Sequence, residues 1–215
     1  MNQDANDLAA LRAEYELGGL VESDLPPDPL DLFRSWFADV RAAGIGEPNA
    51  MVLATSVDGV PSSRTVLLKG LDADGFVFFT NYDSRKGAEL AANPACALLF
   101  GWYGVQRQVR IEGTAARVDR AETEEYFSSR PRPSQLGAWA SEQSREVASR
   151  TALDAAYAAT EDRFGDGAIP APPHWGGYRV TPRVIEFWQG RRGRMHDRLA
   201  YRREGDGWVT RRLAP

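Results

Sequence analysis

Met51-Val-Leu-Ala-Thr-Ser56, Thr65-Val-Leu-Leu-Lys69 and Phe76-Val-Phe-Phe-Thr80 are three runs of aliphatic, β-branched and aromatic residues that follow one another closely. Runs of this length, bounded by turn residues, are typical of β-strands. Asp58-Gly59 and Asp74-Gly75 supply the turns, because such dipeptides favour tight reversals between antiparallel neighbours. This part of the chain therefore predicts an antiparallel meander.

Strand-like runs continue toward the C-terminus. They cover Ala95–Tyr103, Gln106–Val118, Tyr178–Thr181, Val184–Gln189, Arg198–Arg203 and Trp208–Leu213. Because strands dominate and helices are fewer, the pattern predicts an α+β fold, with an antiparallel barrel and helices packed outside it.

Helical segments flank and interrupt these strands. Asp28-Pro29 opens a helix that ends near Gly44, and its apolar residues recur at three- and four-residue spacing. Further helices are expected at Arg85–Ala92, from Asp119 with Glu122 at the capping-box position, and over Ser144–Phe164.

The N-terminal residues 1–25 differ from the rest. They are expected to contain an amphipathic helix, Leu8–Leu17, which Gly18-Gly19 and a linker ending at Pro26-Pro27 separate from the next helix. We expect residues 1–25 to be mobile and residues 26–215 to form a single domain.

Length and composition restrict the class of protein. With 215 residues, 43% of them hydrophobic, the chain can bury a sizeable core. Its longest nearly unbroken apolar stretch, Ala95–Val105, is shorter than the roughly 20 residues that span a bilayer. Met1–Ala10 lacks the basic region and apolar core of a secretory signal. We therefore expect a cytoplasmic protein without a membrane helix.

Few residues are available for disulfide or metal chemistry. Cys96 is the only cysteine, and His174 and His196 are too far apart in sequence for a local metal motif. No metal site is expected. A net charge of −4 argues against nonspecific nucleic-acid binding, although residues 191–203 are rich in arginine.

Lys69 and Lys86 are the only lysines, since almost all other positive charge is arginine. A position that keeps a compact ammonium where arginine is the default suggests a specific role. Lys69 ends the run that begins at Arg64, a pattern that also fits an ordinary barrel strand with charged ends.

The second lysine lies in Phe78-Phe-Thr-Asn-Tyr-Asp-Ser-Arg-Lys86, where a strand passes through Asp83 and Ser84 into a helix. Arg85 and Lys86 in the first helical turn oppose the helix dipole unless an anion also occupies that end. Free backbone N–H groups and two cations together suit a phosphate, whereas the alternative is a solvated surface turn.

Other polar residues form weaker candidate sites. Tyr126, Arg130 and Ser134 lie around a loop that Pro131 and Pro133 stiffen, and their donors suit a second dianion. The amides and hydroxyls of Gln106-Arg-Gln-Val-Arg110 and Gln143-Ser144 can read the edge of a heterocycle. Ile185-Glu-Phe-Trp-Gln-Gly190 and Arg194-Met-His-Asp-Arg198 bring a Trp, a His and two Arg close in sequence.

Together these segments resemble one family, the pyridoxine/pyridoxamine 5′-phosphate oxidases, which are FMN enzymes with a split-barrel fold. The matching motifs are RTVLLK from Arg64, FFTNYDSRKG from Phe78, RQVRIEG from Arg107, YFSSRPRPSQLGAWAS from Tyr126, QS from Gln143, PPHWGGYRV from Pro172, IEFWQGR from Ile185, RMHDR from Arg194 and RLAP from Arg212. Phe79, where the family often has Tyr, and Met195, where it usually has Leu, depart from the pattern.

The resemblance implies a set of site residues. It assigns FMN contacts to Arg64, Thr65, Val66, Leu67, Leu68, Lys69, Phe79, Thr80, Arg85, Lys86, Gln108, Gln143, Ser144, Trp188 and Arg198. It assigns substrate contacts to Arg12, Ala13, Glu14 and Tyr15 as a lid, to Lys69, Tyr126, Arg130 and Ser134 at the substrate phosphate, and to Arg194, Met195 and His196 at the pyridine ring. Arg194 and His196 are the implied catalytic residues.

The resemblance also implies the reaction and the assembly. FMN would oxidise pyridoxine 5′-phosphate and pyridoxamine 5′-phosphate to pyridoxal 5′-phosphate, with O2 as electron acceptor and H2O2 as product. The protein would be a homodimer whose two FMN sites lie at the subunit interface. The alternatives are a split-barrel flavoprotein that uses a reduced nicotinamide or a deazaflavin, a module that only binds FMN or pyridoxal phosphate, and an arginine-rich tail that binds nucleic acid.

Overall fold

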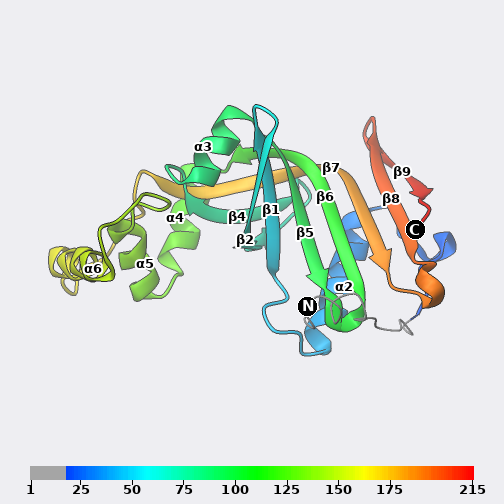
Figure 1. Ribbon diagram of the computed structural model, residues 1–215, viewed down its shortest axis with the longest axis horizontal. Helices are drawn as coiled ribbons and strands as arrows, with labels where there is room; N and C mark the ends of the chain where they lie inside the picture. The colour runs from blue at the N-terminus through cyan, green and yellow to red at the C-terminus, as the bar shows by residue number, and fades with distance from the viewer. Residues whose placement is uncertain (1–17) are drawn as a thin grey trace, which may run out of the picture. The chain divides into compact units, whose positions relative to one another are not determined.

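The computed structural model describes residues 18–215 (Figure 1). The expected helix over residues 8–17 and the expected lid over residues 12–15 lie outside the described part. Two sets of segments each form a compact unit. Within the described residues, the terminal unit comprises residues 18–48, Gly101–Arg110 and Val184–Pro215, and the central unit comprises Asn49–Phe100 and Ile111–Arg183.

The described residues form one antiparallel strand network. Its strands are β1 (Ala50–Val57), β2 (Val60–Leu67), β3 (Gly70–Leu71), β4 (Phe76–Asn81), β5 (Ala95–Trp102), β6 (Arg107–Arg117), β7 (Trp175–Gln189), β8 (Asp197–Glu204) and β9 (Gly207–Arg212). The strands pair in the order β2-β1-β5-β6-β7-β4-β3, and β8 joins β7 to β9. The structure has more strands than α-helices, and the strands are antiparallel, so the expected α+β class is confirmed.

The β1–β2 hairpin forms at the expected turn. Val57 pairs with Val60, and Asp58 and Gly59 between them have φ of 52° and 77°. Two positive φ values in a two-residue loop define the turn that matches strand twist. The expected strand start at Thr65 is wrong, because pairing with β1 begins directly after this turn and includes Pro61 and the polar residues Ser62 and Ser63.

The last part of the sheet contains one long strand where two were expected. Tyr178–Thr181 and Val184–Gln189 are both parts of β7, which continues through Pro182. Residues up to Val180 pair with β4, and residues from Val184 pair with β8. Pro182 lies between the two pairings, so its missing N–H removes no bond from either ladder.

The helices over the described residues are α2 (Pro29–Ala42), α3 (Arg85–Ala92), α4 (Arg120–Ser128), α5 (Arg132–Ala140) and α6 (Arg150–Phe164), with short 3₁₀ turns η1 (Glu22–Asp24), η2 (Tyr103–Val105) and η3 (Arg192–Arg194). Asp28 caps α2 by accepting the Leu30 N–H at 2.8 Å, as expected of an Asp before a helix. None of these helices is both long and apolar enough to cross a membrane.

Two expectations about helices are wrong. The expected loop after Tyr126 is interrupted by α5, because Pro133 falls in the first helical turn, where a missing N–H costs no hydrogen bond. The helix expected from Ser144 begins only at Arg150, since Ser144 has a φ of 72° and Ser149 provides the cap. Trp139 of α5 and Phe164 of α6 pack with ring centroids 5.5 Å apart, and the two helices lie side by side in Figure 1.

Each unit has its own aromatic core. In the central unit the buried side chains of Phe76 and Phe100 pack at 6.3 Å between ring centroids. In the terminal unit Phe187 contacts Trp36 of α2 at 5.2 Å and Tyr201 of β8 at 5.9 Å. These cores fix the strands and helices that carry the polar residues described next.

Candidate cofactor and substrate site

The start of α3 is fixed by a buried serine. Ser84 is fully buried, its hydroxyl donates to the Asn81 carbonyl at 2.6 Å, and it accepts the Gly87 N–H at 3.3 Å. Gly87 is required here because a Cβ at this position would lie 2.0 Å from the Tyr82 carbonyl oxygen. Because this cap fixes where α3 begins, it also fixes the direction in which the side chains of Arg85 and Lys86 project from the helix.

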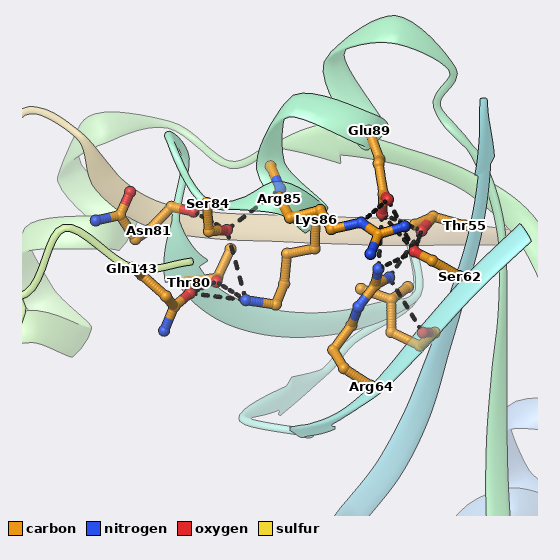
Figure 2. Close-up of polar contacts among 12 residues, drawn as sticks. Thr55, Ser62, Arg64, Thr80, Asn81, Ser84, Arg85, Lys86, Glu89 and Gln143 are labelled. Carbon is orange, nitrogen blue, oxygen red and sulfur yellow. Dashed lines mark hydrogen bonds and ion pairs between the residues drawn. The ribbon is translucent and has the colours of Figure 1, made fainter. Parts of the chain in front are cut away.

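Lys86 brings three of the predicted residues together. Its Nζ donates to Gln143 Oε1 at 2.7 Å and to Thr80 Oγ1 at 3.1 Å, and it lies 3.5 Å from Ser84 Oγ (Figure 2). All three acceptors are neutral. Burial, and then the charge of Arg64, lower the pKa of Lys86. A half-buried ammonium surrounded by neutral oxygens is a suitable partner for an anion.

Arg64 lies on β2 and is held by a second cluster. Its Nη1 donates to Thr55 Oγ1 at 2.7 Å, and its Nη2 donates to Glu89 Oε2 at 2.6 Å and to the Ser62 hydroxyl. Arg85 donates from Nε to Glu89 Oε1 at 2.8 Å, one turn along α3. The two cations in the first turn of α3 predicted an anion at that end of the helix. Glu89 of the same helix supplies part of this negative charge.

Glu89 was not among the predicted site residues. Desolvation raises its pKa, but hydrogen bonds from Thr55, Ser62, Arg85 and Arg64 outweigh burial and bring the pKa down to about 2. The four-residue spacing from Arg85 to Glu89 is the sequence signal that could have indicated their pairing. The approach of Arg64 from another strand has no local signal.

The other predicted residues of the central unit lie on neighbouring backbone. Thr65, Val66 and Leu67 end β2, Leu68 is buried, and Lys69 is exposed, with its backbone N–H bonded to the Val77 carbonyl at 2.8 Å. Gln143 and Ser144 lie in the connection between α5 and α6, and their side chains are exposed. The alternation of buried Leu68 and exposed Lys69 follows the strand period expected from Arg64 onward.

Two predicted substrate residues, Tyr126 and Arg130, lie in an aromatic cluster with Phe79, which was assigned to FMN, and Trp175. Phe79 lies with its ring centroid 4.0 Å from Tyr126 and 5.5 Å from Trp175. The Arg130 guanidinium lies 4.6 Å from the centroid of Trp175. Ser134 is the third residue of α5 and follows the same loop. Trp175 lay within a matching motif, but no role had been assigned to it.

Arg130 has a buried donor without a partner. Among the described residues, nothing accepts a hydrogen bond from its Nη1, although that atom is inaccessible to solvent. Desolvation lowers the pKa of Arg130 and raises the pKa of Tyr126, and each group partly opposes the shift of the other. Buried donors are nearly always satisfied in folded proteins, so this one fits an anion that binds here.

Arg198 and Gln108 belong to the terminal unit. Arg198 Nε donates to Glu186 Oε1 at 2.8 Å, and its Nη1 donates to the Ala214 carbonyl at 2.9 Å. The hydrogen bond to Glu186 is the main reason that the pKa of Arg198 is raised. Glu186 is nearly buried on β7 and was not predicted, while Gln108 lies on β6.

His196 lies beside Trp188, another predicted residue. The two ring centroids are 4.6 Å apart with an interplanar angle of 42°. His196 Nδ1 accepts the Arg191 N–H at 3.1 Å, so the neutral imidazole carries its proton on Nε2. Desolvation, and then the charge of Arg194, lower the pKa of His196. The neutral imidazole is therefore favoured near neutral pH.

The loop that carries His196 has an unusual backbone. Gly193 and Arg194 have φ of 63° and 60°, and Met195 is exposed. Asp197 ends the loop: its carboxylate accepts the Leu20 N–H at 3.1 Å and a hydrogen bond from Arg212 at 2.7 Å. Arg212 also pairs with Glu22 at 2.7 Å. Residues 20–22 are thus held to the end of this loop.

Comparisons with known proteins cover almost the whole chain. Residues 38–164 match the family model described as pyridoxamine 5′-phosphate oxidase, and residues 175–215 match the one described as the pyridoxine 5′-phosphate oxidase C-terminal dimerisation region. A pyridoxine/pyridoxamine 5′-phosphate oxidase of Nocardioides sp. is 60% identical, over 97% of this chain and 98% of that protein. One from Cupriavidus metallidurans is 57% identical, over 97% of this chain and 99% of that protein.

Solved structures agree with these matches. PhzG from Burkholderia lata, in complex with tetrahydrophenazine-1-carboxylic acid, has a TM-score of 0.88 and 34% identity, with 94% of this chain and 100% of that one covered. An FMN-binding, pyridoxamine 5′-phosphate oxidase-related protein of Nostoc punctiforme has a TM-score of 0.69 at 15% identity and supports the fold alone. The expected split-barrel class is confirmed. The chain belongs to the pyridoxamine 5′-phosphate oxidase family.

Proposed function

We propose that this chain is an FMN-dependent oxidase that converts pyridoxine 5′-phosphate and pyridoxamine 5′-phosphate to pyridoxal 5′-phosphate, with O2 as electron acceptor and H2O2 as product. The observation that carries the proposal is the presence of two separate cationic groups, one around Lys86 and one around Arg130. FMN and the substrate each carry one phosphate, so the reaction needs two such groups. The names of relatives at 57–60% identity support the same reaction.

The group around Lys86 would hold the FMN phosphate. Among the described residues, Lys86 donates hydrogen bonds to neutral oxygens, and Arg64 and Arg85 lie on β2 and α3. At an effective dielectric constant near 20, a cation and an anion about 4 Å apart attract by roughly 4 kcal/mol before desolvation. Thr80 and Gln143 would add neutral hydrogen-bonding groups to the same phosphate.

The other proposed FMN contacts come from strand ends and loops. They are the segment Thr65, Val66, Leu67, Leu68 and Lys69, together with Phe79, Gln108, Ser144, Trp188 and Arg198. Backbone groups of a strand end, amides and an indole suit a flat heterocycle with carbonyl and ring-nitrogen edges.

The group around Arg130 would hold the substrate phosphate, with Tyr126, Ser134 and Lys69 as further donors. The buried Nη1 of Arg130 needs an acceptor, and a phosphate oxygen supplies one without loss of the stacking on Trp175. Phe79 is enclosed by Tyr126 and Trp175, so its side chain supports the position of the tyrosine. The departure from Tyr at position 79 is therefore compatible with the proposed site.

When bound, FMN would supply the hydride acceptor for the substrate C4′ carbon, with O2 as the final electron acceptor. His196, with its proton on Nε2 and its Nδ1 engaged by the Arg191 N–H, would donate a hydrogen bond to the substrate and is not set up as a base. Burial first, and the charge of Arg194 second, lower the pKa of His196 and favour its neutral form. Arg194 would also orient the pyridine ring together with Met195. Arg12, Ala13, Glu14 and Tyr15 would close over the ring.

The proposed assembly is a cytoplasmic homodimer with each FMN site built from both chains. The match of residues 175–215 to a dimerisation region supports association of two copies. Residues 26–215 would act as one FMN-binding domain. The lid would come from the part of residues 1–25 that precedes Leu20, because Leu20 and Glu22 are held by Asp197 and Arg212.

One assay tests the reaction. Purified protein is incubated in air with FMN and either phosphorylated vitamer, and H2O2 and the absorbance of the aldehyde are followed, with flavin-free protein as control. Both products should appear in equal amounts with each substrate. If a yellow protein yields neither, flavin binding stands and the oxidase proposal is wrong. Flavin reduction by NADH in the same samples would favour the nicotinamide-dependent alternative.

A further inference from the structure

Within the described part of the chain, Glu89 is the carboxylate to which Arg64 and Arg85 donate hydrogen bonds at the start of α3. Its two oxygens accept hydrogen bonds from Thr55 at 2.6 Å, from Ser62 at 2.8 Å, and from the two arginines described above (Figure 2). The donors come from β1, β2 and α3, so this side chain connects three elements. Only 14% of the Glu89 side chain is exposed to solvent.

The charges of this cluster match a phosphate ester. Arg64, Arg85 and Lys86 bring three positive charges, and Glu89 cancels one of them. The remainder of two positive charges equals the charge of a phosphate monoester dianion. Without Glu89, the three cations would repel one another at a partly buried site. The side chains of Arg64 and Arg85 could then move away from it.

We propose that Glu89 is a positioning residue for the FMN phosphate, because it holds Arg64 and Arg85 at the start of α3 and leaves Lys86 to the anion. This inference rests on the proposed function, since it assumes that FMN is the ligand. Glu89 itself does not contact the phosphate in this assignment. Its effect is transmitted through the two arginines, whose guanidinium groups are fixed by the carboxylate between them.

Riboflavin separates positioning of the phosphate site from a purely structural role. It carries the same ring as FMN but no phosphate, so a change in the cations should leave its affinity intact. Full-length protein loaded with either flavin is diluted, and release is followed by the recovery of flavin fluorescence. Glu89→Gln keeps the volume of the side chain and removes its charge, and Glu89→Ala removes both.

We expect both variants to weaken FMN binding by about tenfold or more, the loss typical of one hydrogen bond to a charged group, and to change riboflavin affinity by less than about twofold. Ser62→Ala keeps the carboxylate but removes a hydroxyl that holds it, so the same selective loss should appear at a smaller size. Ser62→Ala also keeps the inference testable if the Glu89 variants do not fold. Glu124→Gln breaks a matched surface pair with Arg120 and should change neither affinity.

Three results would overturn the inference. Equal losses of FMN and riboflavin affinity would mean that Glu89 only stabilises the fold through its ion pairs. Unchanged FMN affinity in both Glu89 variants would remove any role, and tighter FMN binding would mean that the carboxylate competes with the phosphate for the arginines. If the unsubstituted protein binds neither flavin, the proposed function itself is wrong, which is a separate outcome.

Discussion

Arg130 illustrates how one residue can serve binding at the cost of stability. Its buried Nη1 has no acceptor among the described residues, and an unsatisfied buried donor costs about 1–3 kcal/mol. The stacking on Trp175 keeps the guanidinium in place despite this cost. An apolar side chain of similar length would remove the penalty and also remove the contact proposed for the substrate phosphate.

We therefore predict that Arg130→Met raises KM for pyridoxine 5′-phosphate about tenfold or more, while the melting temperature without substrate stays the same or rises. Steady-state kinetics and thermal unfolding provide the two measurements. Arg163→Met is the matched control, because Arg163 also stacks on a tryptophan, Trp139, at 4.7 Å. A clear drop in melting temperature with unchanged KM would refute the prediction.

The titration of His196 gives a second prediction. Its pKa lies below the usual 6.5 because of desolvation first and the charge of Arg194 second. Arg194→Ala removes the second cause, so the pKa should rise part of the way back toward 6.5. Titration of the histidine resonances by NMR measures this change, and Arg203→Ala, where the arginine stacks on Trp208, is the control.

The sign of the pH effect follows from the same shift. Because the folded-state pKa is lower than the unfolded-state value, the unfolded chain binds a proton that the folded chain does not in the range just below pH 6.5. His196 therefore makes the protein less stable as the pH falls through that range, and Arg194→Ala should reduce this loss. An unchanged His196 titration in the variant would contradict the assignment of Arg194.

At the residue scale, the sequence predicts which cations belong to the candidate site better than it predicts the side chains that contact the site residues. Lys86, Thr80 and Gln143 were selected in advance and do meet in the structure. Glu89 and Trp175 were missed, since their roles depend on Arg64 and Phe79, which lie 25 and 96 positions away in the chain. Contacts of this kind are set by strand pairing and leave no periodic signal.

The element that carries the proposed phosphate site is α3, and its cap can be tested. Ser84→Ala removes both the acceptor for the Gly87 N–H and the bond to the Asn81 carbonyl, so we predict a loss of about 1–2 kcal/mol in stability. Ser149→Ala removes an equivalent cap from α6, a helix without buried residues, and should cost less. Chemical denaturation of both variants measures the difference, and equal losses would contradict it.

The elements themselves were predictable where local chemistry decides them. Asp58-Gly59 fixes a hairpin, Asp28 caps α2, and Arg85–Ala92 matches α3 at both ends. Two errors involve proline, which can end a helix or strand but is also tolerated at certain positions within one. Pro133 lies in the first turn of α5, and Pro182 lies inside β7. In both places the outcome depends on which N–H groups the surrounding structure requires, and that is not a local property.

At the scale of the whole molecule, the proposed dimer can be tested by complementation. Lys86→Ala and Arg198→Ala should each abolish FMN-dependent turnover. If each site takes Lys86 from one chain and Arg198 from the other, a mixed dimer has one intact site. Coexpression in equal amounts should then restore about a quarter of the normal activity, since half of the dimers are mixed and half of their sites are intact.

The measurement is the specific activity of the coexpressed protein, with the two single variants mixed after purification as a control for subunit exchange. Recovery of no activity, with normal dimers present by light scattering, would mean that both residues come from the same chain. The proposal that Lys86 of one chain and Arg198 of the other share one site would then be wrong.

Lys69 and Lys86 are the only lysines in the sequence, the first exposed and the second half-buried against Gln143. An amine-directed acylating reagent therefore has two side chains to label, and each belongs to a different proposed phosphate group. Mass spectrometry of the two labelled peptides would measure occupancy: FMN should protect Lys86, and the vitamer should add protection at Lys69, which is proposed to contact both ligands. Because the chain has only these two lysines, their labelling reports on the proposed phosphate positions without any substitution.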